Sequence, residues 1–199
     1  MRELFEEMDT HLLRDEKPSQ YLQCLDCHAF KKTYPFTMLS RLKHIEQSPR
    51  YHPEGNVWNH TLLVVDEAAA RKEKALVGSR VFMWAALLHD IGKSTTTKIR
   101  NGRITAYDHD KAGAVMSRKF LQEFEDEPFL SDVAALVRWH MQILYAAKDL
   151  RFADFDAMKR EAETRDIALL GLCDRLGRLG SDKHREEKII QDFLRMAER

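Results

Sequence analysis

Residues 84–93 read WAALLHDIGK, an apolar stretch that ends in an imidazole and a carboxylate side by side, His89 and Asp90. Burying two such groups without partners is costly, because each loses its hydrogen bonds to water. The apolar residues before them are typical of a buried helix. The pair therefore predicts a buried polar centre to which other segments of the chain also contribute.

The rest of the chain is predicted to be all-α, because apolar residues recur at helical spacing and no long alternating segment competes with them. Residues 1–48 are expected to hold two or three short amphipathic helices, broken near Pro18 and Pro35. Asn101-Gly102, between β-prone residues, predicts a small hairpin within 97–107. Further helices are expected over 57–74, 79–92, 111–125, 131–146, 153–164, 166–176 and 182–198.

Length and charge indicate one domain over residues 1–199, made of an N-terminal helical segment (1–48) and a core (49–199). Lys and Arg total 32, as do Asp and Glu, so no overall charge favours nucleic acid or an anionic membrane. The acidic N-terminus is unlike a signal peptide, and no segment has the roughly 20 apolar residues that span a bilayer. A cytoplasmic protein without a membrane partner is expected.

Three cysteines are present, and two of them form the sequence Cys24-Leu-Asp-Cys27-His28. C-x-x-C-H is the attachment pattern of c-type haem, and C-x-x-C can be half of a zinc site. The remainder of either site is missing from the sequence. We therefore expect the cysteines to be packed, as small buried apolar residues on or beside a helix.

Three more metal-capable residues lie on the apolar faces of predicted helices, namely His60, His140 and Asp174. A lone imidazole on such a face is usually a core residue bonded to a carbonyl. Together with His89 and Asp90, however, these groups favour a metal site over a purely structural polar core. Imidazole and carboxylate ligands suit a first-row divalent ion such as Mn, Fe, Co, Ni or Zn, with Mg as a further candidate.

The order His60, His89-Asp90, Asp174 resembles the H...HD...D signature of the HD superfamily of metal-dependent phosphohydrolases. HPEGNVWNHTLLVVDEAA, GRITAYDHDKAGA, LVRWHM and DRLGR are similar to the HD region of bacterial tRNA nucleotidyltransferases and poly(A) polymerases. The resemblance implies an HD-type helical bundle in which these four residues bind metal and Asp90 can also bridge to a second ion.

Two departures from those relatives limit what the resemblance carries. Nothing in the sequence resembles the nucleotidyltransferase head, so the chain looks like the HD region standing alone, and tRNA end synthesis is not expected. Asp110 also stands where relatives often have Glu, which shortens the side chain beside His109.

Two-metal members of the superfamily have the order H...HD...H...H...D, which His109 and His140 complete in this chain. His140 continues an apolar helical face, whereas His109 begins a helix and has an alternative interpretation as a surface residue. A two-metal site is predicted, with binding of one metal by the other four ligands as the alternative.

The expected activity is hydrolysis of a phosphoester by a metal-activated hydroxide that Asp90 helps to orient. Lys93 is the predicted catalytic cation that contacts phosphate. Arg175 and Arg178 are candidates for substrate binding, although both could instead pair with surface acids. On the hairpin, the basic side chains could reach over the site or lie in solvent.

The resemblance implies a nucleotide or RNA-end phosphoester as substrate, with an RNA 3′ end as a candidate partner. Two other classes of function stay open. A non-catalytic HD scaffold that binds RNA or protein would tolerate loss of the ligands, and all four core ligands are present. A haem or redox protein built on Cys24 and Cys27 would carry a chromophore or a reactive thiol pair. Oligomeric state is not predicted.

Overall fold

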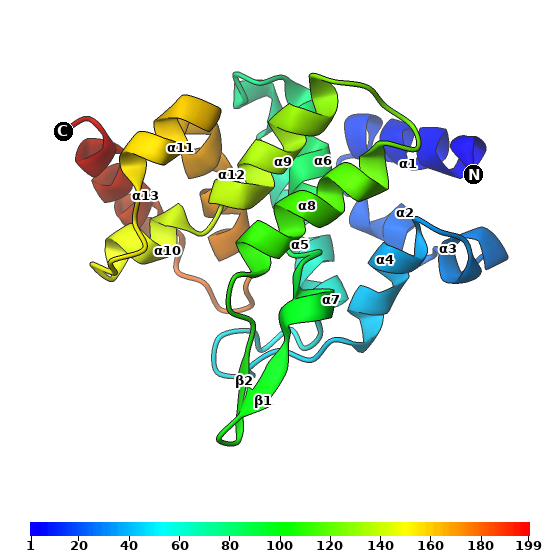
Figure 1. The fold of residues 1–199 in the computed structure, drawn as a ribbon, viewed down its shortest axis with the longest axis horizontal. Helices are drawn as coiled ribbons and strands as arrows, with labels where there is room; N and C mark the ends of the chain where they lie inside the picture. The colour runs from blue at the N-terminus through cyan, green and yellow to red at the C-terminus, as the bar shows by residue number, and fades with distance from the viewer.

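The computed structural model describes residues 1–199 and consists of helices with one two-stranded hairpin (Figure 1), which confirms the all-α prediction. None of these helices has both the length and the apolar character required to cross a bilayer. The elements, in chain order, are α1 (Arg2–Arg14), α2 (Ser19–Gln23), α3 (His28–Lys32), α4 (Thr37–Ser40), the 3-10 turn η1 (Arg41–His44), α5 (Val57–Ala69), the 3-10 turn η2 (Lys72–Lys74), α6 (Ser79–Leu88), α7 (Lys93–Thr96), β1 (Lys98–Arg100), β2 (Arg103–Thr105), α8 (His109–Leu121), α9 (Phe129–Trp139), α10 (Gln142–Ala147), α11 (Phe155–Glu161), α12 (Thr164–Leu176) and α13 (Lys183–Ala197).

One continuous apolar core runs from α1 to α13, with α6 packed against α1, α5, α9 and α12. Phe5 of α1 stacks on Trp84 of α6, with ring centroids 4.6 Å apart. The Trp84 indole donates to Asp9 Oδ1 at 2.7 Å, and Arg80 also pairs with Asp9. The N-terminal helices therefore share the core of the rest of the chain. The division into one domain with boundaries at residues 48 and 49 stays a prediction.

The predicted hairpin is confirmed, and it extends away from the helices in Figure 1. Lys98 pairs with Thr105, and Arg100 pairs with Arg103. Asn101 and Gly102 form the turn with φ of 50° and 71°, the left-handed region that Asn and Gly tolerate best. The hairpin leads directly into α8, so it lies next to His109.

Among the predicted helices that end earlier than expected, two end immediately before a histidine. The helix expected over 79–92 ends at Leu88, and the one expected over 131–146 is divided after Trp139. In both cases the imidazole Nδ1 donates to the carbonyl three residues earlier, Ala86 or Val137. Because that carbonyl would otherwise accept the next backbone N–H of the helix, the side chain takes the place of the helical hydrogen bond.

α7 and α8 approach so closely that only glycine fits between them. A Cβ atom on Gly92 would lie 2.1 Å from the carbonyl oxygen of His109 and 2.5 Å from the backbone nitrogen of Gly113. Gly92 therefore allows the first turn of α8, with His109, to lie beside the end of α6.

The expectation that the C-x-x-C cysteines are buried is wrong. Cys24 and Cys27 lie between α2 and α3 and are exposed, whereas Cys173 on α12 is buried. The helices on either side have only five residues each, so they offer too little apolar surface to cover the two cysteine side chains. No cysteine belongs to a group of side chains that could hold a metal.

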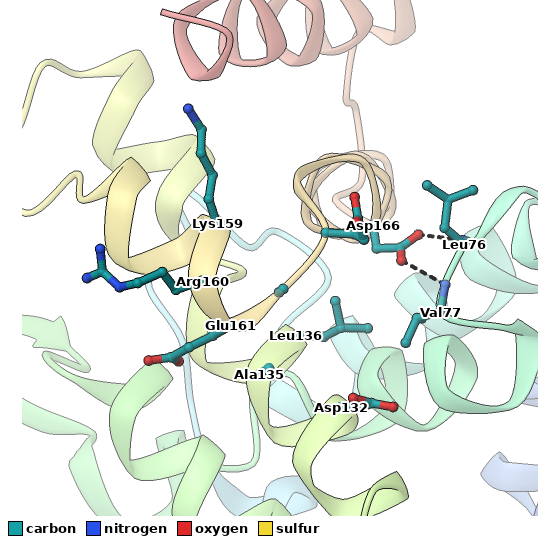
Figure 2. Close-up of a pocket in the computed structure, with 11 residues that line it drawn as sticks. Leu76, Val77, Asp132, Ala135, Leu136, Lys159, Arg160, Glu161 and Asp166 are labelled. Atoms are coloured by element: carbon teal, nitrogen blue, oxygen red, sulfur yellow. Dashed lines mark hydrogen bonds between the residues drawn. The ribbon is translucent and has the colours of Figure 1, made fainter.

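Asp166 is a buried carboxylate that ties α12 to the connection between η2 and α6 (Figure 2). Its two oxygens accept from the backbone N–H groups of Leu76 and Val77, each at 2.8 Å. The carboxylate borders a hollow of about 310 Å³ whose lining also includes Asp132 and Lys159. Its role is explained by these hydrogen bonds, which fix the entry to α6.

We expect Asp166→Ala to lower the free energy of unfolding by about 1–3 kcal/mol, because two backbone donors lose a charged acceptor. Urea unfolding followed by circular dichroism measures the change. Asp156→Ala, an exposed acid in the first turn of α11, is the matched control and should cost less than about 1 kcal/mol. Equal stability of the two variants would contradict a structural role for Asp166.

Candidate metal centre

Five helices bring six metal-capable side chains together in the interior. α5 carries one of them, the segment after α6 carries two, α8 begins with one, the segment after α9 carries one and α12 carries one near its end. All six are buried, and they are His60, His89, Asp90, His109, His140 and Asp174.

Three of the histidines are held in the same way. The Nδ1 atoms of His89, His109 and His140 donate to the carbonyls of Ala86, Ala106 and Val137, at 2.8, 2.6 and 2.7 Å. A carbonyl only accepts, so the proton lies on Nδ1 and the lone pair lies on Nε2. Each ring therefore presents a free Nε2 to the centre, which is the form that binds a metal.

Asp90 lies between the histidines, and its two oxygens face different ones. Oδ2 lies 3.3 Å from His89 Nε2 and 3.9 Å from His60 Nε2. Oδ1 lies 3.4 Å from His109 Nε2 and 4.0 Å from His140 Nε2. The carboxylate is thus shared by two groups of ligands on its two sides.

His60 differs from the other histidines because carboxylates face both of its ring nitrogens. Nε2 donates to Asp174 Oδ1 at 2.9 Å. Nδ1 lies 2.9 Å from Glu54 Oε1. Glu54 is itself buried and also accepts from His52 Nδ1 at 2.9 Å. Glu54 can therefore hold the Nδ1 proton when Nε2 binds a metal.

The charges in the centre fit the roles of Asp90, His109 and His140. Burial by itself raises the pKa of Asp90, but the charges of Lys93 and His89 hold it well below its usual range, so the carboxylate is ionised. Burial, then the charges of His109 and His89, lower the pKa of His140 to about 3. Burial also lowers the pKa of His109. Both shifts favour the neutral form of the ring, which a metal ligand must have.

Unpartnered atoms indicate that the centre is built for a cation. His89 Nε2 and Asp90 Oδ2 are buried and make no hydrogen bond of acceptable geometry, although Lys93 Nζ lies 2.7 Å from that oxygen. Such atoms are costly unless something binds them. Three groups have ligand atoms mutually within 4.8 Å, and two of them consist of the predicted ligands, His60 with His89 and Asp174, and Asp90 with His109 and His140. These donors fit divalent metal ions.

The three predicted phosphate contacts lie in different surroundings. Lys93 is buried, contacts Asp90 and donates to Gln47 Oε1 at 2.6 Å. Arg178 pairs with both oxygens of Asp174, at 3.1 and 2.9 Å. Arg175 pairs with Glu186 of α13, and both side chains are largely covered.

Sequence reasoning missed the outer residues of the centre. Glu54 follows a proline in the turn-rich segment before α5, and only its place in HPEGN near His60 could have drawn attention to it. Gln47 lies 46 residues from its partner Lys93 and has no sequence signal. Asp110, which the sequence had already singled out because relatives often have Glu there, is buried and pairs with Arg138 of α9 at 2.6 Å.

Comparisons with known proteins agree with this geometry. The family described as HD domain matches residues 57–192. The Multifunctional CCA protein of Alkalilimnicola ehrlichii is 28% identical over 98% of this chain and 47% of its own length. The protein of the same name from Halorhodospira halophila is 32% identical over 77% of this chain and 36% of its own length. The one from Azoarcus sp. is 30% identical over 84% of this chain and 40% of its own length. The chain spans less than half the length of these relatives.

We expect Glu54→Gln to weaken Mn²⁺ binding by about 10-fold or more, because the charge that holds the Nδ1 proton of His60 is removed. Competition with a chelating dye measures the affinity of the purified protein. Glu123→Gln, an exposed acid on the segment after α8, is the control and should bind as the wild type does. Unchanged affinity in Glu54→Gln would argue against its support of His60.

Proposed function

This chain belongs to the HD domain family, which lies within a superfamily of metal-dependent phosphohydrolases, and from that premise we propose that it hydrolyses a phosphoester of a nucleotide or an RNA end. The observation that carries the proposal is the position of Asp90. One carboxylate oxygen faces His60 and His89, and the other faces His109 and His140. A shared carboxylate of this kind suits two divalent ions.

The six buried side chains divide into two ligand sets in this proposal. His60, His89 and Asp174 would hold one ion and His109 and His140 the other, with Asp90 available to both. When bound, such ions supply a Lewis acid for a phosphoryl oxygen and lower the pKa of a bound water. The Nδ1 hydrogen bonds to backbone carbonyls keep the rings from turning, so the ligand atoms are arranged in advance.

Lys93 is the residue to which we assign contact with the phosphoryl group. Its ammonium is fixed beside the shared carboxylate by Asp90 and Gln47, and a fixed cation stabilises negative charge that develops on phosphoryl oxygens. Arg178 orients Asp174 through its paired contacts and contributes a second positive charge. Arg175 has weaker support, because Glu186 already neutralises it.

The residues of the hairpin favour the end of a polynucleotide, rather than a small free nucleotide, as the substrate. Residues 91–107 contain no acid, and they include Lys98, Arg100 and Arg103 on the exposed strands. Tyr107 is also exposed, and the Arg100 guanidinium lies 4.9 Å from its ring. Phosphates and bases of a single strand are bound by such cations and aromatic rings.

Hydrolysis assays test the activity itself. Wild type in Mn²⁺ is expected to cleave at least one member of a panel of 2′,3′-cyclic nucleotides, nucleoside monophosphates and phosphorylated oligoribonucleotides. Asp90→Asn should lose at least about 100-fold in rate and lose bound metal, since both ions share this carboxylate. Lys93→Met should keep the metal and lose rate.

Elemental analysis accompanies these assays and separates an enzyme from a non-catalytic scaffold. A wild type that carries no more metal than Asp90→Asn and cleaves nothing would sink the proposed activity. Oligoribonucleotide binding without hydrolysis would favour the scaffold interpretation.

A separate measurement tests the hairpin. Arg100→Ser/Arg103→Ser should weaken binding of a single-stranded oligoribonucleotide and reduce the slope of log Kd against log salt concentration by about 1.4, if each arginine contacts one phosphate. Lys188→Ser/Arg195→Ser on α13 removes the same charge elsewhere and should leave the slope unchanged. Equal slopes in both variants would rule out a phosphate contact by the hairpin.

A further inference from the structure

A hollow of about 660 Å³ lies between the segment before α5 and strand β2, at the base of the hairpin. Its size is in the range of pockets for small ligands. Gln47, Asn56 and Asn59 contribute amide side chains to its lining, and Ile104 contributes an apolar one. In Figure 1 this region is where the chain before α5 passes near the hairpin.

Gln47 contributes a buried amide with an unused donor. Its side chain is 6% exposed, and its Oε1 accepts from Lys93 Nζ at 2.6 Å. An ammonium can only donate, so the amide oxygen must face Lys93 and the amide nitrogen must face away. That nitrogen, Nε2, is buried and has no hydrogen-bond partner. An unpaired buried donor is unfavourable, and an acceptor on a ligand would remove the penalty.

The hollow is linked to the metal centre by short contacts. Gln47 contacts Lys93, whose Nζ lies 2.7 Å from Asp90 Oδ2. On another side, Asn59 is the residue before His60 on α5. A molecule whose phosphate lies at the centre could therefore place its remaining part in the hollow.

The lining suits a neutral, flat, polar group better than a second phosphate. Lys43 is the one Lys or Arg of the lining, and its Nζ donates to the carbonyl of Leu25; Glu46 adds an acidic side chain to the same lining. Asn59 donates through Nδ2 to the Glu54 carbonyl, which leaves its Oδ1 as an acceptor. The residues of the lining thus include Gln47 with an unpaired donor, Asn59 with an acceptor and Ile104 with an apolar side chain.

We propose that this hollow binds the nucleobase of the substrate, with Gln47 Nε2 donating to a carbonyl oxygen of the base. The inference rests on the proposed function for the position of the phosphate. It assigns recognition of the base to residues of the segment before α5 and of β2, outside the metal ligands. Gln47 also positions Lys93, so one amide joins recognition of the base to the cation beside Asp90.

The test compares two non-hydrolysable phosphonates, the analogues of uridine monophosphate and of ribose 5-phosphate, which has no base. Calorimetry with the Mn²⁺-loaded protein should give tighter binding of the uridine analogue. Gln47→Glu keeps an oxygen against Lys93 but removes the donor. Both analogues carry the phosphate that Lys93 contacts, so the informative quantity is the ratio of their affinities. Gln47→Glu should reduce the preference for the uridine analogue over the ribose analogue by about 10-fold.

Two further variants separate a binding role from a structural one. Gln142→Glu alters another buried glutamine, whose amide is used by Phe152 and Asp154, and should leave the preference for the uridine analogue intact. Ile104→Ala on the hairpin should reduce the preference for the uridine analogue by about threefold, since roughly half of the apolar contact of one side chain with the base is lost. The protein should stay folded. This variant therefore provides a test should Gln47→Glu fail to fold.

Two results would overturn the proposal. One is a wild type that binds both analogues equally. The other is a Gln47→Glu variant that loses affinity for both analogues to the same extent, since that would place the effect at Lys93 and the metal centre. A wild type that prefers the uridine analogue but hydrolyses no phosphoester would overturn the proposed activity and support the base site.

Discussion

The ionised carboxylate of Asp90, buried to 2% exposure, is the constraint on which the rest of the structure depends. A charge in that position needs compensation, because the interior solvates it poorly. Lys93 supplies one positive charge at 2.7 Å, and the Nε2 atoms of four histidines face the same two oxygens, an arrangement that suits a bound cation. Helices α5, α6, α8, α9 and α12 must therefore meet at one point.

The histidines connect this chemistry to the helices that carry them. The Nδ1 atoms of His89 and His140 donate to backbone carbonyls of their own helices. These hydrogen bonds coincide with the ends of those helices and also fix the proton on Nδ1. His109 forms the same bond at the beginning of α8. One hydrogen bond thus sets the end of an element and the ligand form of a ring. The close approach at Gly92 then allows His109 to reach Asp90.

A second set of polar residues surrounds the ligands and extends toward the surface. Glu54 lies between His52 and His60, and Gln47 lies between Lys93 and the hollow beneath the hairpin. These residues bind no ion in the arrangement proposed above. They orient groups that do, or that contact phosphate, and they provide the surroundings in which one substrate can be distinguished from another.

The sequence by itself determined the fold class, the hairpin at Asn101-Gly102 and the buried faces of His60, His89, His140 and Asp174, because helical spacing and turn chemistry are local properties. It also carried the resemblance to the HD family, which the family match bears out. The roles of the site residues stay predictions, and their geometry favours a shared Asp90.

Only the tertiary structure decided which atoms face one another. The helix ends at His89 and His140 depend on a side chain replacing a backbone donor, which apolar spacing does not reveal. The exposure of Cys24 and the pairing of Arg175 with Glu186 depend on neighbours distant in space. The roles of Glu54 and Gln47 follow from their contacts, Glu54 with His60 and Gln47 with Lys93. Such contacts are set by how helices pack, and packing joins residues that no local pattern relates.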